Sequence, residues 1–263
     1  MKNTATGKKS RESIFWAFAA ILSLVALWQL ISMATQGKNI LPPPFKVFAA
    51  FLRAFAKPIG KHTLPSHLGY SLMRVVVGYA IASVTGIGLG LGMGWSRMTE
   101  AIVKPIFELF RPIPPLAWIP MGILWFGIGE NTKYFIIFIA TFMTITLNAY
   151  RGARNVDPVL IGAARMLGAS ERQIFFHIVM PSSVPQIFAG LQVALSSGWM
   201  AVLAAEMVRS SEGAGWIIIR GMETGNTVQI LVGMISIGIV GFLIATAMRE
   251  AERRLCAWNV QGR

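Results

Sequence analysis

The sequence is poor in the residues that build most reactive sites. It has one cysteine, Cys256, and three scattered histidines, His62, His67 and His177. A single cysteine cannot form an internal disulfide, and no Cys-x-x-Cys pair or Cys/His cluster indicates a metal site. Charged residues make up 13% of the chain, against ~25% in a typical soluble domain. We therefore expect no catalytic residues, no metal site and no cofactor held by this chain.

Apolar sequence is what the chain has in excess. Hydrophobic residues make up 54% of the 263 residues, and the mean hydropathy is +0.59. A water-soluble core of this size does not need so apolar a chain, so lipid is the expected solvent. The net charge of +13 is compatible with nucleic acid or with an anionic membrane surface. The long apolar runs favour the membrane and argue against nucleic acid.

Six segments come close to the ~20 apolar residues that a helix needs to cross the hydrocarbon core. The predicted spans are 14–34, 68–95, 113–128, 132–150, 184–208 and 228–248. The first follows a basic stretch but is longer than the ~7–15-residue core of a signal peptide, so we expect it to be retained. The amphipathic stretch 45–56 predicts an interfacial helix. The predicted fold is an all-α membrane protein with one transmembrane domain, 14–250, between two tails, 1–13 and 251–263.

The distribution of basic residues predicts the orientation of these spans. With six spans both termini lie on one side of the membrane. Of the 24 Lys and Arg residues, 15 fall on the side of the termini, 8 on the opposite side, and Arg74 inside a predicted span. Cytosolic segments carry the excess of Lys and Arg. We therefore expect both termini in the cytosol.

Glycines repeat in the second half of the second predicted span. Gly86, Gly90 and Gly94 form one small-x-x-x-small row, and Gly88 and Gly92 form another. A phosphate-binding loop is excluded because no Lys-Ser/Thr follows and the glycines lie inside a span. Small residues at this spacing let helices approach closely in membranes. Both rows are therefore predicted to be packing surfaces.

The loop 151–183, between the fourth and fifth predicted spans, is dense in helix start and stop signals. Asp157 is expected to cap a helix that begins at Pro158, and Gly168 is expected to end it. Ser170 and Gln173 form a capping box for a second short helix. Pro181 is expected to end that helix, and a second capping box formed by Ser183 and Gln186 is expected before the fifth span.

The first short helix, predicted over 158–167, is apolar and rich in small residues. At ~15 Å it is too short to cross the membrane, and its side chains include Ile161, Gly162, Ala163, Ala164 and Leu167. An apolar helix outside the membrane needs a surface to cover it. A partner protein and the underside of its own bundle both satisfy this requirement, so the residues alone leave both open.

This loop resembles the EAA motif of ABC importer permeases. The resemblance rests on Ala163-Ala164-x-x-x-Gly168 with Ile178 and Pro181 downstream, although the leading Glu of the motif is Gly162 here. It extends from about Leu41 to the C-terminus, through the runs LPPP (41–44), RPIPPLAWIPMGILWFGIGE (111–130), VDPVLIGAARMLGAS (156–170) and VLAAEM (202–207). These runs are similar to the permeases for taurine and aliphatic sulfonates, nitrate, bicarbonate and cyanate, and residues 125–130 favour the sulfonate branch.

The resemblance implies a type I importer transmembrane domain with a cytosolic coupling helix, in a bacterial inner membrane. Implied partners are a second copy of the chain, two ATPase subunits and a periplasmic or lipid-anchored solute-binding protein, within membrane lipid. ATP and Mg²⁺ would bind to the ATPase, because Gly7-Lys8-Lys9-Ser10 does not fit a phosphate-loop motif. The implied docking residues are Ile161, Gly162, Ala163, Ala164, Leu167, Gly168, Ala169 and Pro181. A charge at Ala164, or Ala164→Pro, is expected to uncouple transport.

Four residues are candidates for the translocation pathway or its gate. Pro114 and Pro115 interrupt a predicted span, which fits either a cavity lining or a packing kink. Trp118 fits either the pathway or an interfacial anchor. Glu206 lies near the end of the fifth span, where a carboxylate is costly and usually paired. We expect a salt bridge from Glu206 to Arg209 or Arg111.

Two other function classes are less well supported by the sequence. A stand-alone secondary transporter or channel predicts internal repeats and mid-span charges, and the sequence has no clear repeat. A membrane enzyme requires a constellation such as H-E-x-x-H within a span, and none is present. For an importer, taurine or another sulfonate is the first expected solute. Nitrate or bicarbonate is next, and a small heterocycle is a further alternative.

Overall fold

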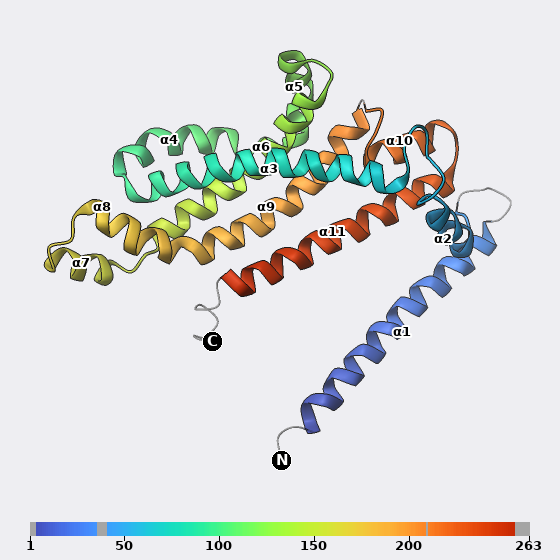
Figure 1. Cartoon of the computed structure of the whole chain (residues 1–263), viewed down its shortest axis with the longest axis horizontal. Helices are drawn as coiled ribbons and strands as arrows, with labels where there is room; N and C mark the ends of the chain where they lie inside the picture. The colour runs from blue at the N-terminus through green and yellow to red at the C-terminus, as the bar shows by residue number, and fades with distance from the viewer. Residues whose placement is uncertain (1–3, 36–40, 209, 256–263) are drawn as a thin grey trace. The chain divides into compact units, whose positions relative to one another are not determined.

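The computed structural model describes residues 4–35, 41–208 and 210–255, and these residues are almost entirely helical (Figure 1). Within them there is no β-strand, only an isolated bridge between Ile59 and His62. The helical elements, in order, are α1 Thr4–Ala34, α2 Pro44–Arg53, α3 Leu64–Trp95, α4 Arg97–Phe110, the 3₁₀ helix η2 Pro115–Trp118, α5 Ile119–Phe126, α6 Glu130–Arg154, α7 Pro158–Met166, α8 Glu171–Ile174, the π-helical turn η3 Phe175–Val179, α9 Met180–Val208, α10 Ala214–Glu223 and α11 Thr227–Leu255.

In the described residues, four helices are long and apolar enough to cross a membrane by length and composition. They are Leu64–Trp95, Glu130–Arg154, Glu171–Val208 and Thr227–Arg254. Each coincides with one of the six predicted spans. An all-helical membrane fold, as predicted, is therefore what the chain adopts.

The other two predicted spans, 14–34 and 113–128, correspond to shorter apolar helices, Phe18–Ala34 and Pro115–Phe126. The second of these departs most from the prediction. Proline fixes its backbone angle and lacks an amide hydrogen, so Pro112, Pro114 and Pro115 divide the segment into an extended stretch, η2 and α5. Gly127 then adopts a left-handed conformation, with φ of 74°, and ends α5.

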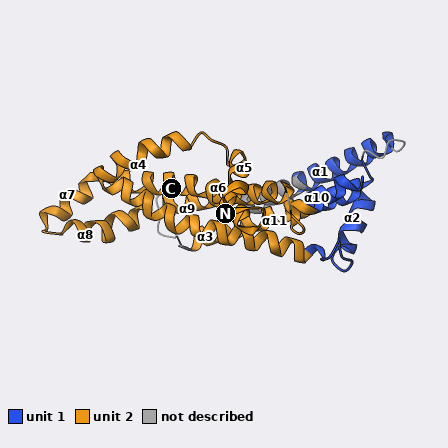
Figure 2. Ribbon diagram, turned by 90° about the horizontal axis from the view of Figure 1, so that it is seen from above, with its two compact units in different colours: residues 1–64, 217–235 blue, residues 65–216, 236–263 orange. Residues whose placement is uncertain are grey.

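The chain divides into two compact units, shown in different colours in Figure 2. Unit 1 comprises residues 1–64 and 217–235, and unit 2 comprises residues 65–216 and 236–263. In unit 1, α2 occupies the stretch predicted as an interfacial helix, and the indole of Trp28 donates to the carbonyl of Pro42 at 3.1 Å. All the candidate site residues lie in unit 2.

The core of unit 2 forms where α6 packs against α9 and α3. Its buried side chains include Ile136 and Ile137 of α6, Val75 of α3, and Trp199 and Val202 of α9. A methyl group added at Gly198 would lie 2.8 Å from the Thr141 side chain. Small residues therefore bring α6 and α9 into close contact, as expected for helices in lipid.

One of the two predicted glycine rows packs against α6 and the other does not. A methyl group at Gly86, Gly90 or Gly94 would lie 3.0 Å or less from α6. At Gly88 it would meet nothing within 4 Å, and at Gly92 only Thr99 at 3.8 Å. The row Gly86–Gly90–Gly94 is therefore confirmed as a packing surface. The prediction for Gly88 and Gly92 is wrong, because residues two positions along a helix point to a different side.

Pro181 does not end a helix, contrary to the prediction. It is the second residue of α9, directly after the π-helical turn η3, and the helix runs on to Val208. A proline inside a helix removes one backbone hydrogen bond, and here it directly follows the π-helical turn, where the hydrogen bonds already depart from the regular pattern. The second predicted capping box is also wrong, because the Ser183 hydroxyl donates to the Val179 carbonyl at 2.6 Å inside this continuous helix.

Candidate functional site

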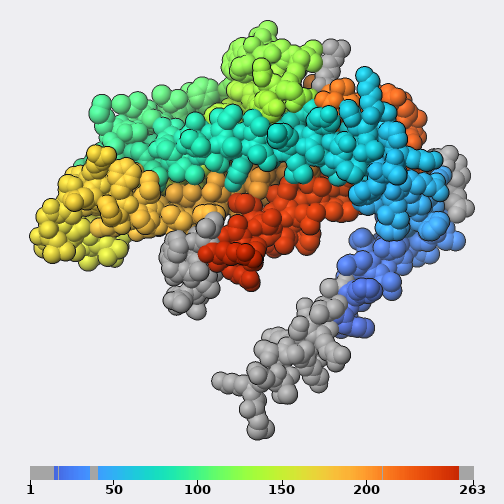
Figure 3. Space-filling model, in the orientation of Figure 1, coloured from blue at the N-terminus to red at the C-terminus, as the bar shows by residue number. Residues whose placement is uncertain are grey.

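The segment α7–α8 lies at one end of unit 2 (Figures 1 and 3). The predicted start signal of α7 at Asp157 and its predicted stop signal at Gly168 are both confirmed. Asp157 accepts a hydrogen bond from the Val159 amide at 2.8 Å. Gly168 has φ of 78°, and the Ala169 amide donates to the Ala164 carbonyl at 3.0 Å, which is the bond pattern of a glycine-terminated helix. The ends of α7 are therefore fixed by local hydrogen bonds.

The start of α8 also follows the prediction. Ser170 and Gln173 form the complete capping box, with both reciprocal hydrogen bonds present. Arg165 of α7 pairs with Glu171 of α8 at 2.9 Å, but both side chains are exposed, and exposed ion pairs contribute little to stability. The capping hydrogen bonds, more than this ion pair, define the turn between the two helices.

The two sides of α7 have different surroundings. Ile161, Ala164 and Ala169 pack inward, against a buried cluster that includes Ala153 and Ile174. Val159, Leu160, Met166 and Leu167 point outward, and the last two are 86% and 88% exposed. An apolar helix normally buries all its faces. One face of α7 is thus covered by its own bundle, while the other remains apolar and uncovered.

The residues predicted for docking are divided between these two faces. Ile161, Ala164 and Ala169 face the bundle, whereas Ala163, Leu167, Gly168 and Pro181 are exposed. A methyl group at Gly162 would meet nothing within 4 Å. The outward residues Val159, Leu160 and Met166 were missed. They lie four, three and three residues from Ala163, a spacing that would have placed them on its face of the helix.

A groove of about 490 Å³ lies in the middle of unit 2. Its lining comes from the chain between α4 and η2, from α6 and from α9, and consists of Phe110, Arg111, Ile113, Pro115, Leu116, Ile139, Ala140, Met143, Thr144, Leu147, Asn148, Ser197, Met200 and Ala201. Of the four predicted pathway residues, only Pro115 belongs to this lining. Pro114 is exposed beside η2.

Trp118 belongs to an aromatic cluster and not to the groove. Its ring lies 5.9 Å from that of Phe110 and 6.4 Å from those of Trp125 and Phe135, measured between centroids. Aromatic pairs at these separations add packing energy. This cluster holds η2 and α5 against α6.

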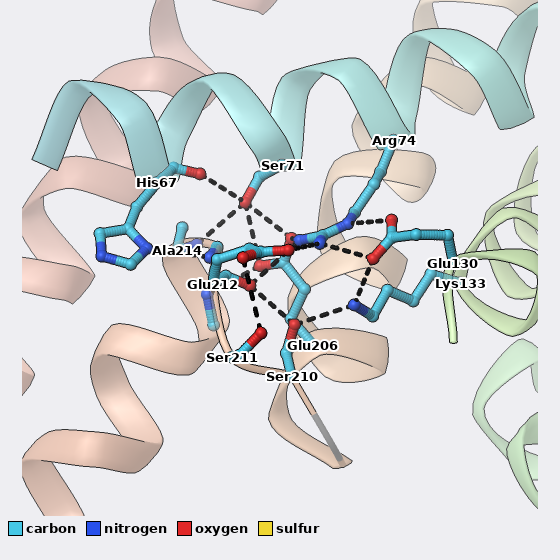
Figure 4. Close-up of polar contacts among 12 residues, drawn as sticks. His67, Ser71, Arg74, Glu130, Lys133, Glu206, Ser210, Ser211, Glu212 and Ala214 are labelled. Carbon is cyan, nitrogen blue, oxygen red and sulfur yellow. Dashed lines mark hydrogen bonds and ion pairs between the residues drawn. The ribbon is translucent and has the colours of Figure 1, made fainter. Parts of the chain in front are cut away.

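Glu206 lies in a buried network of hydrogen bonds and ion pairs at the end of unit 2 where α3 begins (Figure 4). Its carboxylate accepts hydrogen bonds from the Ser71 hydroxyl at 2.8 Å, from Arg74 Nη1 at 2.8 Å and from the Gly215 amide at 2.9 Å. The predicted salt bridge exists, but its partner is Arg74 and not Arg111. The other predicted partner, Arg209, lies outside the described residues.

Arg74 is the centre of this network. Its Nε lies 2.6 Å from Glu130, its Nη1 2.8 Å from Glu206, and its Nη2 3.3 Å from Glu212. Lys133 pairs with Glu130 at 2.7 Å. A charged side chain at membrane depth is tolerated when it is paired within the protein, and Arg74 has three carboxylate partners.

The network fixes the segment between α9 and α10 onto α3. The Ala214 amide donates to Ser71 at 2.9 Å, and the Gly213 amide donates to His67 Nδ1 at 3.1 Å. A sequence signal was available for these contacts. His67, Ser71 and Arg74 are spaced by four and three residues in an apolar helix, so they share one face.

A second polar cluster joins α4 to α6. The Tyr150 hydroxyl donates to Glu100 Oε1 at 2.6 Å, and Lys104 and Arg154 lie 3.4 and 3.5 Å from the same carboxylate. The hydrogen bond from Tyr150 is the main reason that the pKa of Glu100 lies below its usual value, and the two cations lower that pKa further. Helix α4, which contains Pro105, was not predicted.

Removing the Tyr150 hydroxyl should raise the pKa of Glu100. A carboxylate with a lowered folded-state pKa stabilises the fold above its unfolded pKa, and this contribution is lost as the pH falls through the folded value. Tyr150→Phe should therefore lower the melting temperature at pH values above the unfolded pKa of a glutamate, and should make the further loss of stability on acidification smaller than in the wild type. The measurement is thermal stability in detergent from about pH 3 to pH 6. Tyr150→Phe should have no such effect in a Glu100→Gln background, and an unchanged acid profile of the single variant would contradict the assignment.

The amino-acid sequence is similar to a family of transport proteins and to several named permeases. Residues 82–251 match the family described as "Binding-protein-dependent transport system inner membrane component". The chain is 36% identical to the taurine transport system permease protein TauC of Escherichia coli, over 90% of this chain and 86% of the relative. It is 33% identical to the nitrate import permease protein NrtB of Leptolyngbya laminosa, over 90% and 86% of the two chains.

Solved structures share the fold at lower sequence identity. A crystal structure of an amino acid ABC transporter with histidines matches with a TM-score of 0.63 and 16% identity, over 79% of this chain and 96% of the other. An inward-facing MetNI methionine ABC transporter matches with a TM-score of 0.58 and 20% identity, over 70% of this chain and 93% of the other. The helices described above thus have the type I importer arrangement that the sequence predicted. With the family match extending from α3 into α11, the chain belongs to the binding-protein-dependent transport system inner membrane components, the permease family of ABC importers.

Proposed function

We propose that this permease forms the translocation pathway of an ATP-driven importer for a small anion, with taurine or another aliphatic sulfonate as the first candidate. The observation that carries the proposal is the outward apolar face of α7, formed by Val159, Leu160, Met166 and Leu167. Exposed apolar patches of this kind are typical of protein interaction sites. The partner that we propose for this face is the cytosolic ATPase subunit.

The packing and the fixed ends of α7 suit a docking element that transmits motion. Its inner face packs on the bundle through Ile161 and Ala164, and its ends are fixed by the Asp157 cap and by Gly168. The following helix is continuous from Glu171 to Val208. A displacement of α7 would therefore reach a membrane span through one short turn. ATP and Mg²⁺ would bind to the ATPase, and its closure would drive alternating access.

A second copy of the chain and a solute-binding protein complete the proposed assembly. A second copy facing the central groove would enclose a pathway between the two chains. The distribution of Lys and Arg supports a cytosolic location for α7 and for both termini, in a bacterial inner membrane. A periplasmic or lipid-anchored binding protein would then deliver solute at the opposite face.

The proposed solute class follows the names of the relatives and the chemistry of the groove. Relatives include permeases named for taurine and for aliphatic sulfonates, the latter 29% identical. The groove is lined mainly by apolar side chains with a few polar ones, which suits a small organic anion. Nitrate is the second candidate, because another relative is named a nitrate import permease.

Charge on the outward face of α7 should abolish transport and leave the fold intact. Met166→Asp and Leu167→Asp place a carboxylate where an apolar contact with the ATPase is proposed, while Met166→Leu is the matched apolar control. Ala164 is a poorer test site, because it packs against the bundle and a charge there would disturb folding. The measurement is co-purification of the ATPase and ATP-dependent uptake of labelled taurine and nitrate in vesicles. Retained uptake and ATPase binding in Met166→Asp would rule out α7 as the docking element.

A further inference from the structure

The central groove has an asymmetric charge. Of its fourteen lining residues one, Arg111, is cationic and none is acidic. The other polar residues of the lining are Thr144 and Asn148 of α6 and Ser197 of α9. The rest of the lining is apolar. The groove wall therefore carries a net positive charge at a single position.

The part of the groove that α6 lines lies at membrane depth. The groove lining on α6 runs from Ile139 to Asn148 and includes the midpoint of the helix Glu130–Arg154. An arginine at such a depth is costly unless it is paired or faces a water-filled cavity. Because Arg111 lines the groove, the second condition applies to it.

Arg74 and Arg111 differ in their ion-pair partners. Arg74 is buried and pairs with Glu130, Glu206 and Glu212. For Arg111, the described part of the chain offers no ion pair with a carboxylate. The charge of Arg74 is thus neutralised within the fold, whereas that of Arg111 is available to an anion in the groove.

The neighbouring polar groups are largely occupied by contacts within the protein. The Asn148 amide donates to the Thr144 carbonyl at 2.8 Å, and its oxygen accepts from Gln186 at 3.0 Å. Ser197 donates to the Val193 carbonyl at 3.1 Å. Arg111, by contrast, presents a planar fork of several N–H donors. It is therefore the main donor that the groove offers to a ligand.

We propose that Arg111 binds the anionic group of the transported solute and selects for a sulfonate or a similar small oxyanion. This inference rests on the proposed function. A guanidinium group forms paired, charge-assisted hydrogen bonds with tetrahedral and planar oxyanions, and lysine does not reproduce that geometry. Leu116, Met143 and Met200 line the same groove and would accommodate a short aliphatic chain attached to the anion.

The test is uptake of labelled ethanesulfonate by the complete transporter in proteoliposomes. Arg111→Gln should lower the uptake rate about tenfold to a hundredfold, the factor expected when a charge-assisted hydrogen bond is lost. Arg111→Lys should retain part of the rate. Arg97→Gln, which removes an arginine of α4 that does not line the groove, should leave it unchanged. ATPase activity stimulated by the binding protein should persist in Arg111→Gln.

Two results would overturn the assignment. One is an ethanesulfonate uptake rate in Arg111→Gln that equals the rate of the wild type. The other is loss of stimulated ATPase activity together with uptake, which would make Arg111 a structural residue.

A measurement on the purified chain separates this inference from the proposed function. Ethanesulfonate should raise the melting temperature of the wild type and of Arg97→Gln, but not of Arg111→Gln. If ethanesulfonate raises these melting temperatures as expected while neither the wild type nor any variant imports it, the importer proposal fails and the anion site stands. If ethanesulfonate does not raise the melting temperature of the wild type, the anion site fails.

Discussion

Replacing Glu206 with alanine should destabilise the folded chain by about 3–5 kcal/mol, the cost of breaking a buried ion pair by removing one partner. Glu206 accepts hydrogen bonds from Ser71, Arg74 and Gly215, and all three donors would lose an acceptor. Arg74 would retain Glu130 and Glu212, which are partly exposed. The buried side of its guanidinium would then face no carboxylate.

The matched control is Glu250→Ala at the end of α11. Glu250 pairs with Arg253 and Arg254, whose side chains are 75% and 77% exposed. Exposed ion pairs contribute about 0–1 kcal/mol. Thermal unfolding in detergent, followed by size-exclusion chromatography, should show a large drop in melting temperature for Glu206→Ala and almost none for Glu250→Ala. Equal drops would mean that the buried network contributes no more than a surface pair.

Gly213 gives an independent check of the same network. Its φ of 116° lies in a region that other residues rarely adopt, and an added methyl group would overlap the Glu206 carboxylate. Gly213→Ala should therefore disturb the carboxylate without removing any charge. A destabilisation comparable to that of Glu206→Ala is expected in the same assay.

Replacing Gly90 with leucine should separate α3 from α6 and prevent stable folding. Even a methyl group at Gly90 would overlap the Thr146 carbonyl and lie 2.6 Å from the Ala149 side chain. Overpacking a close interface usually costs about 1–3 kcal/mol per substitution. We expect the upper end or more, because the obstructing atoms include backbone of α6, which cannot change rotamer.

Gly88→Leu is the control for this prediction, since it adds the same side chain two residues away on the same helix. A methyl group at Gly88 meets nothing within 4 Å, so leucine is expected to be tolerated there. The measurement is the yield of monodisperse protein in detergent and its melting temperature. If Gly90→Leu and Gly88→Leu behave alike, the close approach of α3 to α6 is not needed for the fold.

The features that the sequence predicted correctly depend on neighbours in the chain. The Asp157 cap, the Gly168 stop and the Ser170–Gln173 box each involve residues separated by a few positions, so spacing alone is enough to identify them. The long apolar runs of α3, α6, α9 and α11 were equally plain, because each approaches the thickness of the hydrocarbon core.

The features that were missed depend on contacts between distant segments or on departures from a regular helix. Glu206 meets Ser71 across 135 residues and Arg74 across 132, a separation that the sequence does not reveal, so Arg209 and Arg111 were predicted as its partners instead. Helix α4, which contains Pro105, was not predicted. Pro181 was expected to end a helix, but the helix continues through it, directly after the π-helical turn. The outward face of α7 was missed because apolar residues lie on both the inner and the outer side of the helix, so that its composition does not indicate which side is covered.

The π-helical turn Phe175–Val179 has a consequence for how residues on its two sides can be compared. A π turn accommodates one more residue than a regular turn, and one residue corresponds to a rotation of about 100° around a helix axis. Residues of α8 and α9 therefore cannot be placed on one helical wheel. Deleting a single residue within 175–179 would allow a regular α-helix to form through this point. Such a deletion would leave the membrane span intact but rotate the attached helix α7, so that its outward apolar face would point in a different direction.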